Sequence, residues 1–74
     1  MTRYKFSIVI EKDKDGYYAY CPELQGCYAQ GDTYEEVIAN IKDAIKLHIE
    51  DRHASNEEIR QPEMTSIANI EVTA

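Results

Sequence analysis

The chain has 74 residues, with 8 Lys and Arg against 14 Asp and Glu, and a formal net charge of −6. A chain of this length forms one domain with a thin stability margin, and its negative charge repels phosphate backbones. Direct nucleic-acid binding is therefore disfavoured, and without a run of about 20 apolar residues a membrane span is excluded.

The first predicted element is a strand over residues 3–11, and its apolar side chains alternate along the chain: Tyr4, Phe6, Ile8 and Ile10. This period of two is typical of a strand with one buried face. Residues 12–16 read Lys-Asp-Lys-Asp-Gly, which favours a tight turn. They predict a hairpin to a second strand over residues 16–21, with Tyr17 on one face and Tyr18 and Tyr20 on the other.

A short third strand is predicted over residues 27–30, after a bend at residues 22–26. Pro22 ends the second strand because proline has no N–H to donate to a ladder, and Gly26 suits a reversal of the backbone. The three strands are expected to form an antiparallel meander.

A helix is predicted over residues 33–53. Thr33 and Glu36 have the spacing of a capping box, in which the hydroxyl accepts from the backbone amide three residues later. The residues that follow recur at three- and four-residue spacing and form an apolar stripe: Tyr34, Val37, Ile38, Ile41, Ala44, Ile45, His48 and Ile49. One helix is therefore expected to cover one face of the sheet.

The remaining residues predict a polar loop and a fourth strand. The loop contains Pro62, which disfavours a long second helix. The fourth strand is predicted over residues 67–73, where Ala68, Ile70 and Val72 alternate with polar residues. A right-handed crossover through the helix permits this strand to lie parallel to the first, in the order 3-2-1-4. The predicted fold is α+β with the element order βββαβ, in a single domain of residues 1–74.

Cysteine and histidine offer no convincing metal site. Cys21 and Cys27, with no leader peptide evident, predict reduced thiols in a cytoplasmic protein, although a disulfide in oxidised preparations stays open. Together with His48 and His53 they have the ligand types of zinc. However, the two histidines are five residues apart and would not share a helix face. No metal and no cofactor are expected.

No catalytic constellation is predicted either. Two-metal nuclease chemistry needs several converging carboxylates. Asp13 and Asp15 lie in a turn, whereas Glu35 and Glu36 are explained by the start of the helix. No serine, cysteine or lysine stands in a nucleophile motif. The chain is therefore predicted not to be an enzyme.

The tyrosines of the second strand predict self-association. A single helix covers only one face of a sheet, so the other face stays open unless a partner covers it. Tyr17, Tyr18 and Tyr20 supply large aromatic side chains there or nearby. We expect them to contribute to the interface of a homo-oligomer.

Several short motifs, in this order and spacing, resemble the HicB-like antitoxin family: Gly16-Tyr17, Cys-Pro-Glu-Leu-Gln-Gly-Cys at residues 21–27, Gly31-Asp32-Thr33 and Glu35-Glu36. The resemblance implies a truncated ribonuclease-H-like fold. It also implies a non-catalytic protein that neutralises a small basic, HicA-like toxin that cleaves messenger RNA. Many relatives carry an additional DNA-binding module, which is not expected in residues 1–74.

Acidic residues are the candidates for contact with such a toxin. Glu11, Asp13 and Asp15 lie at or near the first hairpin turn, and Glu23 lies in the bend. Negative charge attracts a protein whose own surface binds RNA. The alternative is that these are ordinary solvated charges. At the level of function, the alternative is an orphan oligomeric scaffold or regulatory module of the same fold that binds another protein or a small ligand.

Overall fold

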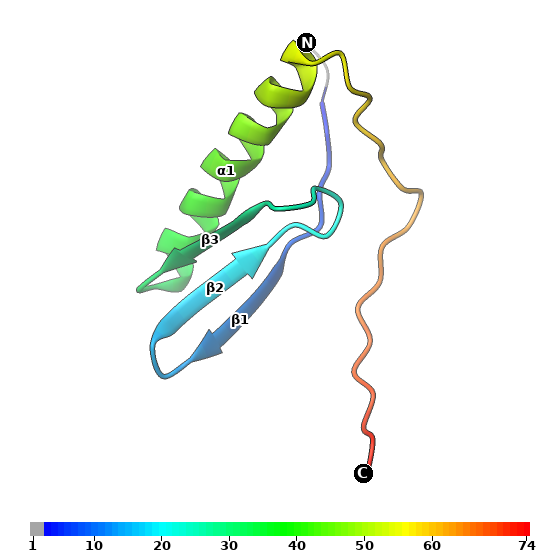
Figure 1. The fold of residues 1–74 in the computed structure, drawn as a ribbon. Helices are drawn as coiled ribbons and strands as arrows, with labels where there is room; N and C mark the ends of the chain where they lie inside the picture. The colour runs from blue at the N-terminus through cyan, green and yellow to red at the C-terminus, as the bar shows by residue number, and fades with distance from the viewer. Residues whose placement is uncertain (1–2) are drawn as a thin grey trace.

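The structure is a computed structural model, and it describes residues 3–74. Its elements in chain order are β1 (Val9–Asp13), β2 (Gly16–Tyr20), β3 (Tyr28–Gly31) and α1 (Tyr34–Ala54). The strands form an antiparallel sheet in the order β1-β2-β3, and α1 covers one face of it (Figure 1). The predicted α+β class and the antiparallel meander are confirmed.

The first strand begins later than predicted, at Val9 instead of residue 3. Val9 lies opposite the last residue of β2, so the earlier residues have no strand to pair with. Pro22 prevents an extension of β2 because it has no N–H. The amide of Ser7 instead donates to the carboxylate of Glu23, with an N to Oε1 distance of 3.0 Å.

Backbone hydrogen bonds hold the bend at residues 22–26. The amide of Cys21 donates to the carbonyl of Cys27 at 3.0 Å, and the amide of Cys27 donates to the carbonyl of Leu24 at 3.1 Å. The amide of Leu24 donates back to the carbonyl of Cys21 at 3.2 Å. Gly26 takes a φ of 81°, which favours glycine. The bend thereby turns the Leu24 side chain into the core, where it is 3% exposed.

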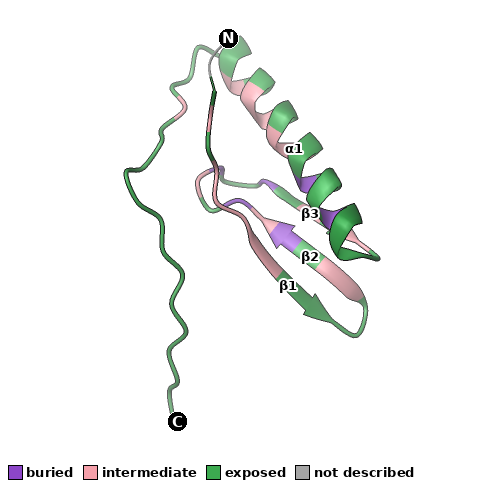
Figure 2. Cartoon of the chain, turned by 180° about the vertical axis from the view of Figure 1, so that it is seen from behind, coloured by how far each residue is buried: buried purple, intermediate pink, exposed green. Residues whose placement is uncertain are grey.

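The core lies between α1 and the sheet, toward β2, β3 and the bend (Figure 2). Its described buried side chains are few, and none is aromatic: Ala19, Cys21, Leu24, Cys27, Val37 and Ile41. The helix packs over β2 and β3 and not over β1. The predicted apolar stripe of the helix is therefore buried only in part.

The helix begins where the capping pattern predicted. Thr33 has extended backbone angles, and its Oγ1 accepts from the amide of Glu36 at 3.1 Å. This satisfies one of the unpaired amides of the first turn. The bounds, Tyr34–Ala54, differ from the predicted 33–53 by one residue at each end. Within residues 3–74, no helix is long and apolar enough to cross a membrane.

Gly31 allows the start of the helix to approach the end of β3 closely. A Cβ atom at this position would lie 2.7 Å from the backbone nitrogen of Val37 and 3.0 Å from its Cα. We expect Gly31→Ala to lower the free energy of unfolding by about 1–3 kcal/mol, because backbone atoms must shift. Urea unfolding measures the loss. Gln30→Ala, on the exposed neighbouring residue, should cost within about 0.5 kcal/mol, and equal losses would contradict this explanation.

The predicted fourth strand is absent from the described single chain. Residues 57–74 have no helix or strand, and residues 67–73 pair with nothing. A hydrogen bond connects this segment to the N-terminal part of the chain: the backbone amide of Lys5 donates to Oε1 of Gln61 at 2.7 Å. After Pro62 the chain runs clear of the sheet (Figure 1). The predicted strand order 3-2-1-4 is thus corrected to β1-β2-β3. A strand needs a neighbouring strand to share its hydrogen bonds, and residues 67–73 do not lie along the free edge of β1.

Candidate partner-binding surfaces

One end of the sheet gathers acidic side chains from two different turns. The β1–β2 turn and the β3–α1 turn meet there, because Gly16 pairs with Asp13 and the next residue, Tyr17, pairs with Gly31. Gly16 has a φ of 130°, and a Cβ on it would lie 3.0 Å from the carbonyl oxygen of Gly31. Glycine at this position therefore lets the two turns lie against each other. We call this region the acidic end.

A hollow of about 440 Å³ opens at the acidic end, and its lining includes four carboxylates: Asp13, Asp15, Asp32 and Glu36. In the described part of the chain, none of them has a Lys or Arg nitrogen within 4.0 Å, and the ion pair present joins Arg52 to Glu57. The amide of Asp15 donates to Oδ1 of Asp13 at 2.8 Å, which fixes the turn. The carboxylates therefore keep acceptor capacity for a basic partner.

The predicted acidic candidates separate into two locations. Asp13 and Asp15 lie at the acidic end, and Glu11 lies beside it on β1, where it lines a smaller depression together with Asp13. Glu23 lies beyond the opposite end of β2 and accepts from the amide of Ser7. Its carboxylate thus holds the N-terminal segment against the bend.

Asp32 and Glu36 were missed as members of this cluster by the sequence analysis, which assigned Glu36 to capping alone. A signal for both was available. In an antiparallel meander, the first turn and the end of the third strand lie at the same end of the sheet. The acidic residues of the two turns could therefore be expected at the same end of the sheet, and the strand register then brings them around one hollow.

The face of the sheet away from α1 carries three tyrosines. Tyr18 and Tyr20 lie there as predicted, and Tyr28 of β3 joins them, pairing with Tyr20 across the strands. The rings of Tyr18 and Tyr28 are stacked, with centroids 6.2 Å apart. Tyr18 is 38% exposed and Tyr28 is 59% exposed. We call these three residues the aromatic face.

Tyr17 lies on the other face of the sheet, toward the helix. It is half-buried, and its ring meets that of Tyr34 edge-on, with centroids 6.2 Å apart. The ammonium of Lys12 lies 5.8 Å from the centroid of the Tyr17 ring. Tyr17 therefore contributes to packing at the acidic end and is not part of the aromatic face.

Both cysteines are free and buried. Burial raises the pKa of the Cys21 thiol, and in the same way that of Cys27, above the ordinary value. At neutral pH they behave as small apolar core residues. Across residues 3–74, no three His, Cys, Asp or Glu side chains gather closely enough to hold a metal ion.

His48 lies at the edge of the core, half-buried on α1. Nη1 of Arg52 donates to its Nδ1 at 3.0 Å. Its Cε1 would lie 4.0 Å from a Cβ placed on Gly26. These contacts fit a structural residue that packs the helix beside the bend.

A family model described as the HicB-like antitoxin of bacterial toxin-antitoxin systems matches residues 6–73. The match spans every strand, the helix and most of the C-terminal segment. The chain belongs to the HicB-like antitoxin family. The resemblance found in the sequence motifs is thereby confirmed.

Relatives of this HicB-like chain occur in bacteria and archaea under the name UPF0150 protein. One from Helicobacter pylori is 45% identical over 64 residues, covering 86% of this chain and 89% of the relative. One from Synechocystis is 44% identical over 62 residues, covering 82% and 78%. One from Thermoplasma acidophilum is 46% identical over 56 residues, covering 74% and 81%.

A solved structure described as a HicA3 and HicB3 toxin-antitoxin complex contains a chain of similar fold. The TM-score is 0.66 at 27% sequence identity, and the alignment covers 81% of this chain and 70% of that one. The arrangement of the HicB-like sheet and helix is therefore shared with a component of a toxin-antitoxin complex.

Proposed function

We propose that this protein is a non-catalytic antitoxin that binds and neutralises a small basic toxin of the HicA kind, which cleaves messenger RNA. The observation that carries the proposal is the acidic end, where two turns place four carboxylates around one hollow. Membership of the HicB-like family and the similarity to a chain of the HicA3 and HicB3 complex support it.

Electrostatics gives the acidic end a physical role. A toxin that binds RNA presents positive charge, and a partner with a net charge of −6 is attracted to that surface before contact. Carboxylates in the place of phosphates then occupy the RNA-binding face of the toxin. Glu11, Asp13 and Asp15 are retained as contact residues in this proposal, and Asp32 and Glu36 are added to them.

Tyr18 extends the proposed contact from the acidic end onto the aromatic face. It lines the acidic hollow and also the depression bounded by Tyr20, Pro22 and Tyr28. Exposed aromatic side chains next to charged groups are typical of protein-binding surfaces. We propose that the aromatic face is covered by protein, either by the toxin or by a further copy in a homo-oligomer.

Co-purification with the candidate toxin tests the function. Where a short, basic reading frame lies adjacent to this gene, its product, co-expressed with the full chain, is the probe. We expect a stoichiometric complex, loss of the toxin's RNA cleavage in that complex, and slower association as salt is raised. A complex that still cleaves RNA, or no complex at low salt, would contradict the proposal and favour the orphan scaffold or regulatory module.

A further inference from the structure

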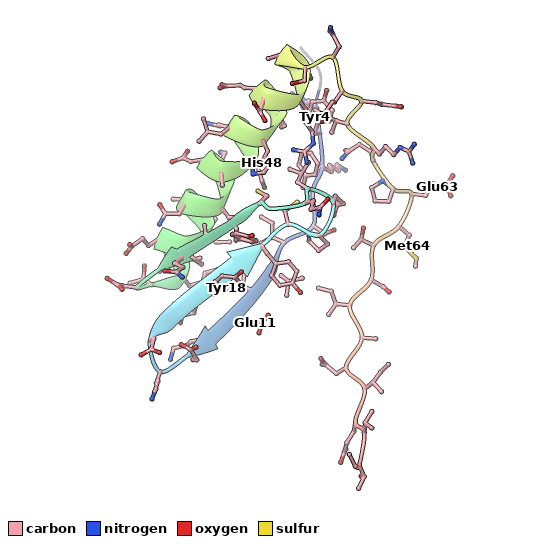
Figure 3. All side chains as sticks on the ribbon, in the orientation of Figure 1. Tyr4, Glu11, Tyr18, His48, Glu63 and Met64 are labelled. Carbon is pink, nitrogen blue, oxygen red and sulfur yellow. The ribbon has the colours of Figure 1, made fainter. Side chains whose placement is uncertain are left out.

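The C-terminal segment is apolar enough to need a partner. Met64, Ile67, Ile70 and Val72 are 77%, 64%, 81% and 78% exposed. Glu63 and Met64 project from a chain that touches no other element at that point (Figure 3). From Ala68 to Thr73, apolar and polar residues alternate as in a strand with one buried face. We call residues 64–73 the tail.

The same chain offers two features that fit such a tail: the free edge of β1, with which a strand could pair, and an apolar groove, which its side chains could fill. β1 is an edge strand, and every second residue of such a strand directs its N–H and C=O away from the sheet. Next to the segment that leads into β1, a groove of about 660 Å³ opens beside α1. Tyr4 and Phe6 line it on one side, and Ile45 and Ile49 line it on the other.

The groove exists because the helix packs over β2 and β3 and leaves the β1 side of the sheet uncovered. Its walls are ordered by their own contacts. The rings of Tyr4 and Phe6 are stacked with centroids 6.0 Å apart, and the hydroxyl of Tyr4 lies 3.2 Å from Nε2 of His53. No residue of β1 lines this groove. A strand on the free edge of β1 would reach it by continuing beside Tyr4 and Phe6, where its alternate apolar side chains would enter the groove.

We propose that the tail of one copy pairs with β1 of a second copy, and that the second copy returns its own tail, so that two chains form a closed dimer by strand exchange. Each chain then gives one strand and receives one, and the interface is self-complementary, as a twofold axis requires. The exchanged strand supplies the fourth strand that the single chain lacks. The exchange does not depend on toxin binding.

The tail points away from its own sheet, which favours pairing with β1 of a second copy over pairing with β1 of the same chain. The hydrogen bond from Lys5 to Gln61 holds the chain just before Pro62. Proline fixes its own φ and disfavours the helical region for the residue before it. Beyond this point the tail diverges from its own sheet (Figures 1 and 2). Its apolar side chains stay exposed, and the groove beside α1 stays open.

Light scattering after gel filtration tests the dimer. The full chain at micromolar concentration should have twice the mass of the 8.5 kDa monomer. The double variant Ile70→Asn, Val72→Asn should raise the dimer dissociation constant by at least about 100-fold, since each change occurs twice per dimer. Glu71→Gln, on the alternate side of the tail, should leave it unchanged. A monomeric full chain, or a dimer that survives the double variant, would overturn the proposal.

Spin labelling distinguishes exchange from a tail that folds onto its own chain. A nitroxide is attached to Thr73→Cys; the native cysteines are buried and react slowly. Labelled chains are refolded with isotope-labelled chains that carry no nitroxide. Broadening of the β1 amide signals in these mixed dimers supports exchange. In a second sample, the same chain carries both the nitroxide and the isotope. Broadening in this second sample alone, or in neither of the two samples, would overturn the exchange.

Discussion

Replacing Asp13, Asp15 and Asp32 together by asparagine is expected to weaken toxin binding roughly 100-fold at low salt. The three side chains line the acidic hollow. Their removal lowers both the attraction that steers the toxin toward this end and the charge-assisted hydrogen bonds formed there. Surface plasmon resonance against the immobilised toxin measures the change, and most of it should appear in the association rate.

The design separates local charge from net charge. Asparagine at position 13 retains a side-chain oxygen that can accept the hydrogen bond from the backbone amide of residue 15, so the turn is preserved. The matched control, Glu50→Gln with Glu58→Gln and Glu63→Gln, removes the same number of charges from the helix and the C-terminal segment. Equal weakening in both triple variants would show that only total charge matters and would remove the acidic end from the proposal.

Ile41→Ala is expected to lower the free energy of unfolding by about 2–5 kcal/mol. Ile41 is fully buried in the core, and among the residues that the structure describes the core has only five other buried side chains to close the space that alanine leaves. The stability of native proteins is about 0.05–0.15 kcal/mol per residue, so the loss is a large part of the total for so short a chain. Urea unfolding followed by circular dichroism gives the value.

Ile38→Ala is the matched control, because it makes the same chemical change one turn earlier on the same helix. Ile38 is 36% exposed, so alanine leaves no closed cavity there. Its loss should be less than half of that at position 41. Similar losses at both positions would mean that the helix packs with a different face toward the sheet than the structure shows.

Local signals in the amino-acid sequence were enough to place several elements of the fold. The capping pair Thr33 and Glu36 placed the start of α1 within one residue, because the hydrogen bond that caps a helix spans only three residues. The alternation in the second strand assigned Tyr18 and Tyr20 to one face and Tyr17 to the other, because successive side chains of a strand point to opposite faces. The family motifs are of the same local kind.

Features that depend on segments distant in the chain could not be predicted from these local signals. β1 begins at Val9 because Val9 pairs with Tyr20, the last residue of β2. The start of one strand is thus fixed by the end of the other strand of the hairpin. The acidic end combines Asp13 with Asp32 because the strand register brings two turns together. The tail has the alternating pattern of a strand but forms no strand in the single chain. Alternation predicts that one face of a strand is buried, but it does not say which strand or surface buries that face.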